Sequence, residues 1–355
     1  MQKLYAGFAV LVLGMGGMTS VGAAGLELRL DRPSQEEYGS GKIVYSLSNT
    51  TDAPVQVLRW QTPVDGVNND LFSVSQNGEP VAYIGRLVKR SAPTDKDYVE
   101  LAPGQSITVD VDLSAYYDMR KGGQYTVRYA RDAADVIRSA NEARRGGVQG
   151  GVLAFDRIGG DSVTIFADAA PDAFDEVEKA AVGILAATNT FVGCSTTRKT
   201  QIATARTSAT SYASNSRSYL TAGTQGSRYT WWFGTYNSSR YSTVRTHFNN
   251  IYSALSSQPF TFDCSCTDDY YAYVYPNQPY RIYLCNAFWS APNTGTDSRA
   301  GTIVHETSHF NVMGGTDDWA YGQSAAHSLA LSNPSRAVDN ADSHEYFAEN
   351  TPARN

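Results

Sequence analysis

Residues 305–309 read His-Glu-Thr-Ser-His, and this pentapeptide constrains the fold of the chain more than any other segment. His305 and His309 are four residues apart, so on a helix they share one face about one turn apart and can bind one metal ion. Glu306 follows the first histidine and can reach a water molecule bound to that metal. The spacing therefore predicts a helix over about residues 298–311 that carries a metal centre.

The His-Glu-x-x-His arrangement is that of zinc-dependent peptidases. A structural zinc site is closed by four protein ligands, whereas a catalytic site keeps one position open for water, so one more protein ligand is needed. Gly314 and Gly315 can turn the chain back sharply after the helix. Asp317 and Asp318 follow, and spacing alone leaves either carboxylate open as the third ligand. Tyr321 could donate a hydrogen bond to the oxyanion of a tetrahedral intermediate.

The chain has 355 residues, which is enough for two domains, and a net charge of −6. This acidic balance gives no basic footprint for nucleic acid. Residues 1–24 read as a signal peptide, because Lys3 precedes an apolar run and small residues at 22–24 offer a cleavage site. The run is too short and too rich in glycine for a transmembrane anchor. We therefore expect secretion, with no membrane contact once the signal is removed.

The cysteines lie in the second half of the chain, at Cys194, Cys264, Cys266 and Cys285. An even number in an exported chain predicts two disulfides. A bond between Cys264 and Cys266 would be strained, which leaves two pairings open. A metal site made of the four thiolates does not fit their wide and uneven spacing. Because the first half has no cysteine, it cannot block a zinc ion with a thiolate.

Residues 25–170 have the pattern of short antiparallel strands. Apolar residues alternate with polar ones from Ile107 to Leu113 and from Tyr125 to Tyr129, as in half-buried strands. Further candidate strands lie near residues 26–30, 42–48, 54–60, 71–75, 80–86 and 162–166. This spacing predicts an all-β sandwich of immunoglobulin-like type. The segment contains no catalytic cluster, which favours a role in packing or binding.

Residues 171–187 are rich in alanine and acidic side chains and form a junction to a second domain at 188–355. That domain is expected to be mainly α, of α+β class. Apolar residues at helical spacing predict a helix near 239–256. Residues 197–221, rich in alanine, serine and threonine with spaced tyrosine and leucine, are compatible with another helix, and a last one is expected near 323–332. Residues 271–275 and 280–284 predict a β-hairpin, and the chain ends in an acidic tail at 340–350.

The second half, over roughly residues 188–355, resembles the deuterolysin and peptidyl-Lys metalloendopeptidase family, the aspzincins. The resemblance rests on the zinc motif, on Gly-Thr-Asp-Asp at 315–318 and Tyr-Gly at 321–322, and on three further segments: Trp-Phe-Gly-Thr-Tyr at 232–236, Tyr-Val-Tyr-Pro-Asn at 273–277, and Asn-Ala-Asp-Ser-His-Glu-Tyr-Phe-Ala-Glu-Asn at 340–350. It implies a zincin-type metallopeptidase domain and the cysteine pairs Cys194–Cys264 and Cys266–Cys285.

The resemblance assigns roles to the motif residues. The family pattern makes Asp318 the third ligand, so that one zinc ion is bound by His305, His309 and Asp318. Glu306 is then the general base, and Tyr321 falls at the position of the family's transition-state tyrosine. The resulting expectation is a zinc endopeptidase that acts on peptides and proteins.

Family members with this pattern cleave on the amino side of lysine, and the positions matching their S1′ pocket are Asp342 and Glu345. Two neighbouring carboxylates in a partly buried pocket would favour an ammonium ion as counter-charge. Without the resemblance, these residues would be read as a solvated acidic tail. The resemblance therefore implies cleavage before lysine, with arginine or less selective cleavage as the alternative.

The resemblance also implies a precursor, in which the N-terminal sandwich is a propeptide that assists folding and covers the cleft. A lysine-directed enzyme could mature itself between Glu178 and Lys179. A basic residue of the propeptide could fill the acidic pocket, and the candidates by charge are Arg86, Lys89, Arg90 and Lys96. We expect a monomer whose own propeptide is an intramolecular inhibitor.

Two other functions compete with this interpretation. One is a broad-specificity, deuterolysin-like toxin protease, which would keep the metal centre but not the preference for lysine. The other is a non-catalytic adhesion or binding protein that contains structural zinc. The intact Glu306 and the open fourth metal position argue against the second alternative.

Overall fold

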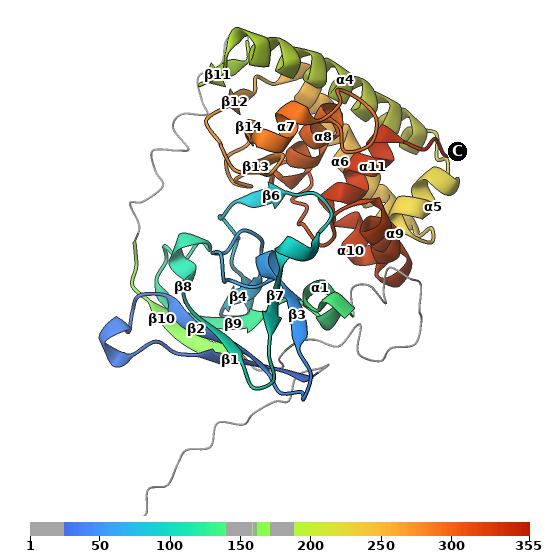
Figure 1. Ribbon diagram of the computed structural model, residues 1–355. Helices are drawn as coiled ribbons and strands as arrows, with labels where there is room; N and C mark the ends of the chain where they lie inside the picture. Colours follow the sequence, from blue (N-terminus) through green and yellow to red (C-terminus); the bar gives the residue numbers. More distant parts are fainter. Residues whose placement is uncertain (1–24, 140–157, 159–161, 171–187) are drawn as a thin grey trace, which may run out of the picture.

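The computed structural model describes residues 25–139, 158, 162–170 and 188–355, and it has a β-rich part followed by a helix-rich part (Figure 1). We call the described residues up to 170 the β region and residues 188–355 the helical region. The segments 1–24 and 171–187, including Glu178 and Lys179, lie outside the described residues. Within the described part, no helix is both long and apolar enough to cross a bilayer.

The β region is built from short antiparallel strands. Its strands are β1 (Leu26–Asp31), β2 (Lys42–Asn49), β3 (Val55–Leu58), β4 (Phe72–Gln76), β5 (Glu79–Pro80), β6 (Leu87–Lys89), β7 (Tyr98–Leu101), β8 (Ser106–Asp112), β9 (Gly123–Tyr129) and β10 (Val163–Ala167). Its helices are α1 (Ala133–Val136) and the 3-10 turns η2 (Gln35–Glu37), η3 (Arg59–Gln61), η4 (Asp95–Asp97) and η5 (Leu113–Ala115).

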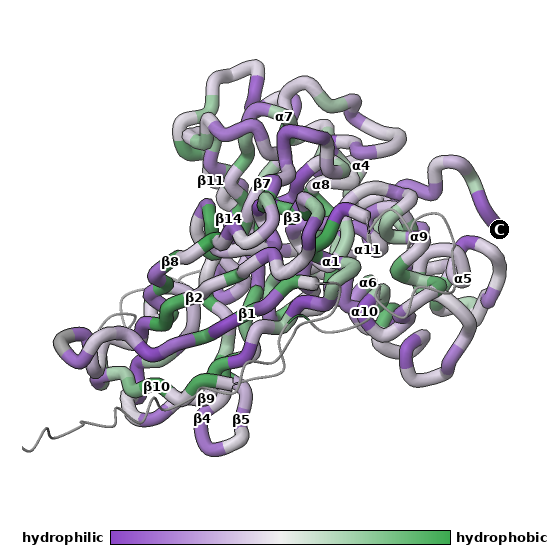
Figure 2. Tube along the Cα trace, turned by 60° about the horizontal axis from the view of Figure 1, so that its bottom comes forward, coloured by the Kyte–Doolittle hydropathy of each residue, from purple (hydrophilic) through white to green (hydrophobic). Residues whose placement is uncertain are grey.

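Apart from β6, these strands form three groups, with the orders β1-β2-β8, β10-β9-β4-β5 and β3-β7. Buried and partly exposed residues alternate along β2, as expected for a strand with one face on a core. The two larger groups meet at this core, where the ring of Tyr45 on β2 contacts Phe72 on β4 and Tyr129 on β9. Along the strands hydrophobic and hydrophilic segments alternate, whereas outlying loops are mostly hydrophilic (Figure 2).

The prediction of a strand at 80–86 is wrong. Only Glu79–Pro80 is strand there, and the chain then leaves the β region's sheets and forms β6 at Leu87–Lys89. Strand β6 pairs antiparallel with a strand of the helical region, and Figure 1 shows it at the boundary between the two regions. Apolar alternation does not reveal this crossing, because the partner strand is almost two hundred residues away in the sequence.

The described residues 188–355, the helical region, form eight helices and four short strands. The helices are α4 (Thr196–Thr221), α5 (Ser227–Phe233), α6 (Ser238–Ser257), α7 (Asn286–Ser290), α8 (Arg299–His309), α9 (Gln323–Ser332), α10 (Pro334–Val338) and α11 (Ala341–Glu349). The strands are β11 (Thr190–Val192), β12 (Thr261–Asp263), β13 (Ala272–Val274) and β14 (Arg281–Leu284).

The predicted helices near 197–221, 239–256, 298–311 and 323–332 are confirmed as α4, α6, α8 and α9, and the predicted hairpin is confirmed as β13–β14. The prediction of an acidic tail is wrong, because residues 341–349 form helix α11 and every one of them is buried. Their carboxylates are therefore part of the interior, where they need counter-charges.

One sheet crosses the boundary between the regions, with the order β11-β12-β14-β13-β6. Strands β11, β12 and β14 are parallel, and β13 and β6 are antiparallel to their neighbours. Disulfides Cys194–Cys264 and Cys266–Cys285, the pairs implied by the family resemblance, tie this sheet to the start of α4 and α7. Helix α8 packs between the sheet and the long helix α4, which has small buried residues at the contact.

Candidate metal centre and substrate pocket

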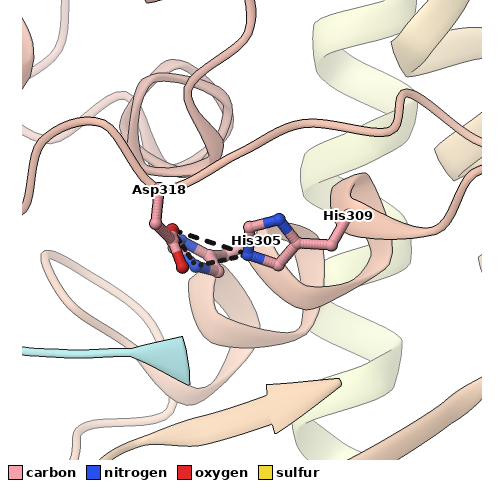
Figure 3. Close-up of side chains that lie close together, drawn as sticks. All are labelled: His305, His309 and Asp318. Carbon is pink, nitrogen blue, oxygen red and sulfur yellow. Dashed lines mark hydrogen bonds and ion pairs between the residues drawn. The ribbon is translucent and has the colours of Figure 1, made fainter. Parts of the chain in front are cut away.

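Helix α8 holds the two motif histidines inside the helical region. The helix begins where Ser298 Oγ accepts a hydrogen bond from the Gly301 amide at 2.9 Å, which caps it. All its residues from 300 to 309 are buried. The spacing of four brings His305 and His309 to one face, and their Nε2 atoms lie 3.1 Å apart (Figure 3).

Asp318 reaches the same point from the loop after α8. Gly315 adopts a positive φ of 57°, which permits the sharp turn, and the Thr316 amide then donates to the Ser308 carbonyl at 3.2 Å. As a result, Asp318 Oδ1 lies 3.3 Å from His305 Nε2 and 3.5 Å from His309 Nε2 (Figure 3). The neighbouring Asp317 points elsewhere and pairs with Arg131 of the β region at 3.1 Å. The geometry thus distinguishes two aspartates that spacing left equivalent.

The three converging atoms fit a tetrahedral zinc ion. Zinc bonds of about 2.0–2.2 Å place neighbouring tetrahedral ligand atoms roughly 3.4 Å apart. The three separations here are 3.1, 3.3 and 3.5 Å. Both Asp318 oxygens are buried and have no hydrogen-bond partner among the described residues. A buried carboxylate that receives no hydrogen bond is costly, so a cation between these groups fits the site.

The far side of each imidazole is also fixed. His309 Nδ1 lies 2.6 Å from the Thr316 carbonyl oxygen, to which it can only donate a proton. His305 Nδ1 lies 2.9 Å from Asp342 Oδ1, and this carboxylate favours a proton on the same nitrogen. Both Nε2 atoms are then left to face the metal, and such outer contacts orient ligands and increase their basicity.

The charges around the site also favour a bound cation. Burial lowers the pKa of His309. Burial by itself would raise the pKa of Asp318, but the two histidines lower it below its ordinary value. Burial would lower the pKa of His305, but neighbouring acidic groups, Asp318 foremost, raise it well above its ordinary value. The pocket is therefore short of positive charge, which a divalent cation would supply.

Glu306 is the proton-accepting candidate beside this centre. Its side chain is fully buried, and neither carboxylate oxygen has a hydrogen-bond partner among the described residues. Burial is the main reason that the pKa of Glu306 rises to about 8, with Asp318 adding to the effect and His305 opposing it. Positive charge at the three ligands would favour the ionised form that can accept a proton.

Tyr321 contacts the β region rather than a free cleft. Its hydroxyl donates to the carbonyl oxygen of Val88 at 2.9 Å and lies 3.3 Å from Asn69 Oδ1. Its ring packs edge-on against Trp60 at 5.9 Å between centroids. The phenol therefore already binds a peptide carbonyl, which is the kind of group that it would stabilise in catalysis.

The acidic pocket next to the metal centre is filled by Lys89. This side chain is fully buried, and its Nζ lies 2.5 Å from Glu345 Oε2, 3.5 Å from Asp342 Oδ1 and 4.0 Å from Asp297 Oδ1. The Nζ also lies 5.1 Å from the centre of the Tyr271 ring. Burial alone would lower the pKa of Lys89, but the carboxylates raise it well above its ordinary value. An ammonium ion is thus what this pocket binds.

Asp342 links the pocket to the metal centre. It contacts the Lys89 ammonium through the same oxygen that faces His305, while its other oxygen accepts from the Gly322 amide at 2.7 Å. Burial would raise its pKa, but Lys89 and His305 outweigh that effect and bring the pKa to about 2. By contrast, burial raises the pKa of Glu345. Asp342 therefore contacts both the candidate metal ligand His305 and the ammonium of Lys89.

Sequence reasoning named Lys89 only as one of four basic candidates. Arg86 instead lies 3.7 Å from Asp268, Arg90 stacks over Tyr270 at 4.2 Å, and Lys96 is exposed in η4. No motif in the sequence points to Asp297, whose carboxylate accepts a hydrogen bond from the Tyr346 hydroxyl at 2.6 Å. Asp297 directly precedes Ser298, the N-cap of α8. Its role in the pocket becomes visible only when the tertiary structure packs the start of α8 beside α11.

The comparisons with known proteins agree with this geometry. The model of the aspzincin M35 family, described as lysine-specific metallo-endopeptidase, matches residues 218–349. A protein named extracellular protease from Aeromonas hydrophila is 44% identical over 339 residues, which is 94% of each chain. This chain belongs to the aspzincin family. It is therefore a zinc metalloendopeptidase, with a β-rich N-terminal part and a helical C-terminal part.

Two further relatives each match a little less than half of this aspzincin. A peptidyl-Lys metalloendopeptidase from Pleurotus ostreatus is 57% identical over 166 residues, which is 46% of this chain and 98% of its own length. A solved zinc peptidase from Grifola frondosa is 54% identical and covers 46% of this chain and 100% of its own, with a TM-score of 0.44.

Proposed function

We propose that this aspzincin is a secreted endopeptidase that cleaves peptide bonds on the amino side of lysine, with one zinc ion held by His305, His309 and Asp318. The observation that carries the proposal is the Lys89 ammonium, buried between Glu345 and Asp342 next to a metal ligand. The names of the family and of the Pleurotus relative specify lysine, and the Aeromonas relative is named as extracellular.

The chemistry divides among a few residues. When bound, zinc would polarise the scissile carbonyl and acidify water. Glu306 takes a proton from the attacking water and passes it to the leaving amine. Tyr321 donates its hydrogen bond to the oxyanion that forms on the carbonyl oxygen. Asp342 and Glu345 bind the substrate ammonium. This binding determines which peptide bond lies beside the zinc ion, Glu306 and Tyr321.

The pocket favours lysine over arginine for a geometric reason. An ammonium ion is a compact charge with three donors, and Lys89 directs it to three carboxylates at 2.5–4.0 Å. A guanidinium is planar and larger, and it would have to fit the same fully buried space. Arginine at this position would leave part of its fork unpaired, which costs affinity.

A matched set of peptides tests the specificity. The enzyme that accumulates in the culture medium is given peptides that differ only at one residue, which is lysine, arginine or norleucine. We expect cleavage before lysine at a rate at least about tenfold above that before arginine, since one unpaired buried polar group costs on the order of 1–3 kcal/mol. Similar rates for all three peptides would instead support the broad-specificity alternative.

We further propose that residues 25–170 are a propeptide with an immunoglobulin-like sandwich, that residues 1–24 are a signal peptide, and that maturation occurs within 171–187. Contacts of the Tyr45 ring on β2 with Phe72 on β4 and Tyr129 on β9, which join the two larger strand groups, support the sandwich. The family model matches residues 218–349, and the Pleurotus relative is aligned with only 46% of this chain, which together support the helical region, 188–355, as the active unit.

The propeptide would act as an intramolecular inhibitor of a monomeric chain. Its strand β6 occupies the free edge of β13, and Lys89 fills the pocket that a substrate lysine would need. The test is N-terminal sequencing of the secreted wild-type enzyme beside the Glu306→Ala variant. We expect a start within 171–187, for example at Lys179, in the wild type only. A fully active secreted form that still begins near residue 25 would contradict the inhibitor role.

A further inference from the structure

We propose that the Val88–Lys89 peptide bond is itself a substrate: the precursor cuts this bond within its own chain, and the two pieces stay assembled over the active site. The inference rests on the proposed cleavage before lysine and adds a second processing bond, distinct from the junction at 171–187. It concerns the only lysine that the described residues place in the acidic pocket.

The strand around this bond is bound as a substrate strand would be. Strand β6 runs antiparallel to β13, with Val88 opposite Tyr273 and Lys89 opposite Ala272. The Tyr271 amide donates to the Lys89 carbonyl oxygen at 3.1 Å. Addition of an extended segment to an exposed sheet edge is a common mode of peptide recognition, in which backbone bonds give affinity and side-chain pockets give specificity.

Two consecutive residues occupy the two recognition points of one scissile bond. The side chain after the bond, that of Lys89, fills the pocket of Glu345 and Asp342. The carbonyl before the bond, that of Val88, accepts the Tyr321 hydroxyl at 2.9 Å. A propeptide that merely blocked the cleft would not need both contacts on adjacent residues in this order.

The reaction balances without any further reactant. Water adds to the carbonyl carbon of Val88 as Glu306 takes its proton, and the Tyr321 hydroxyl stabilises the oxyanion. The carbon–nitrogen bond then breaks, Val88 keeps the new carboxylate, and the amine of Lys89 receives the proton from Glu306. One water molecule is consumed and no electrons are exchanged.

The pieces would remain together because the cut lies between paired strands. The pairs β2–β8, β3–β7 and β4–β9 each join a strand before Val88 to a strand after Lys89. After cleavage, the Lys89 ammonium would also stay paired with Asp342 and Glu345. The cleaved precursor would therefore keep its size and its covered active site, and its release would still depend on a later cut in the junction.

The experiment starts from the purified metal-free precursor and follows the chain after zinc is added. Intact mass and N-terminal sequencing under denaturing conditions should show a fragment that begins at Lys89, at a rate independent of precursor concentration. Size-exclusion chromatography of the same samples should show an unchanged species at the first appearance of that fragment. Glu306→Ala and Lys89→Met should give no such fragment, whereas the exposed control Lys96→Met should behave as wild type.

Two further measurements separate the possible failures. Active enzyme added to the Glu306→Ala precursor should not produce the Lys89 terminus, because that bond is buried from a second molecule. In the metal-free Glu306→Ala chain, an amine-acylating reagent should modify Lys96 and spare Lys89. Equal labelling of both lysines, or a rate that rises with precursor concentration, would overturn the inference.

Activity on added peptides distinguishes this inference from the function on which it rests. A sample that cleaves peptides before lysine but never shows a Lys89 terminus keeps the proposed specificity and rejects cleavage of β6. A matured sample that cleaves no lysine peptide rejects both.

Discussion

The β region and the helical region bury charge in different ways. The described part of the β region has four buried charged residues: Lys89, Arg131, Asp132 and Asp135. All four pair with the helical region, because Lys89 meets Glu345, Arg131 meets Asp317 and the two aspartates meet Arg336. The helical region instead brings three buried carboxylates and two buried histidines together in two overlapping groups that could hold a metal ion: His305, His309 and Asp318, and His305, Asp342 and Glu345.

This difference fits the roles proposed above, in which the helical region is the enzyme and the β region covers it. A buried charge is stable only with a partner, and the carboxylates around Lys89 all lie in the helical region, so Lys89 has these partners only while the two regions are joined. In the proposed function, Asp318, Asp342 and Glu345 of the helical region serve the metal and the substrate ammonium, so they would be needed after separation. The following variants should therefore have opposite effects in the two regions.

The largest effect is expected for Glu306→Gln in the helical region. Removal of the proton acceptor should lower kcat/KM on a lysine peptide by about 10³-fold or more, the range of general acid–base catalysis. Zinc content and thermal stability should remain near the wild type, since no metal ligand changes. Zinc analysis with peptide kinetics checks this, and near-normal turnover would assign the base to another group.

Lys89→Met in the β region should act in the opposite direction. The uncleaved precursor loses the ammonium between Asp342 and Glu345, and breaking a buried pair costs about 3–5 kcal/mol. We therefore expect peptidase activity of the precursor to rise by roughly 100-fold, measured in a background that cannot mature at 171–187. Lys96→Met is the matched control, and an inactive Lys89→Met precursor would show that the cover does not depend on this ion pair.

Glu345→Gln should sharpen the role of the pocket. The substrate ammonium loses its nearest carboxylate, and truncating one partner of a buried charge pair costs about 2 kcal/mol or more, or roughly 30-fold. The ratio of kcat/KM for lysine over norleucine peptides should fall by that factor, while kcat/KM for norleucine stays nearly constant. Equal losses for both peptides would mean that Glu345 supports the fold or the metal instead.

The smallest effect concerns pH at the boundary. Burial, with Asp317 nearby, raises the pKa of Asp70 and of Asp339 from 3.8 to about 7. The folded precursor thus keeps protons that the unfolded chain loses between about pH 4 and 7, so its unfolding free energy decreases as pH rises through that window. We expect a melting temperature a few degrees lower at pH 8 than at pH 5.

Asp70→Asn should reduce this pH dependence, because a neutral amide replaces the titrating group and can still accept the Tyr117 hydroxyl bond, made at 2.7 Å in the wild type. Asp110→Asn, at an exposed position on β8, is the control. Identical melting curves for wild type and Asp70→Asn across the range would place the titration elsewhere.

The sequence predicted features that depend on neighbours along the chain. Helical spacing identified α6 and α8, composition indicated α4, and alternation identified most strands of the β region. The pentapeptide at 305–309 identified both histidines and Glu306, because a helix brings residues four apart to one face. The family resemblance selected Asp318, and the geometry agrees with that selection.

Contacts between distant segments needed the tertiary structure. The residues around Lys89 have no pattern that distinguishes it from Lys96, yet only Lys89 lies against Glu345, 256 positions away in the sequence. The acidic end of the chain looks like a solvated tail until helix α11 packs beside α8 and buries it. Local propensity and spacing determine helices, strands and a metal motif, whereas long-range packing decides which buried charges meet, because desolvated charges are stable only where the fold supplies a partner.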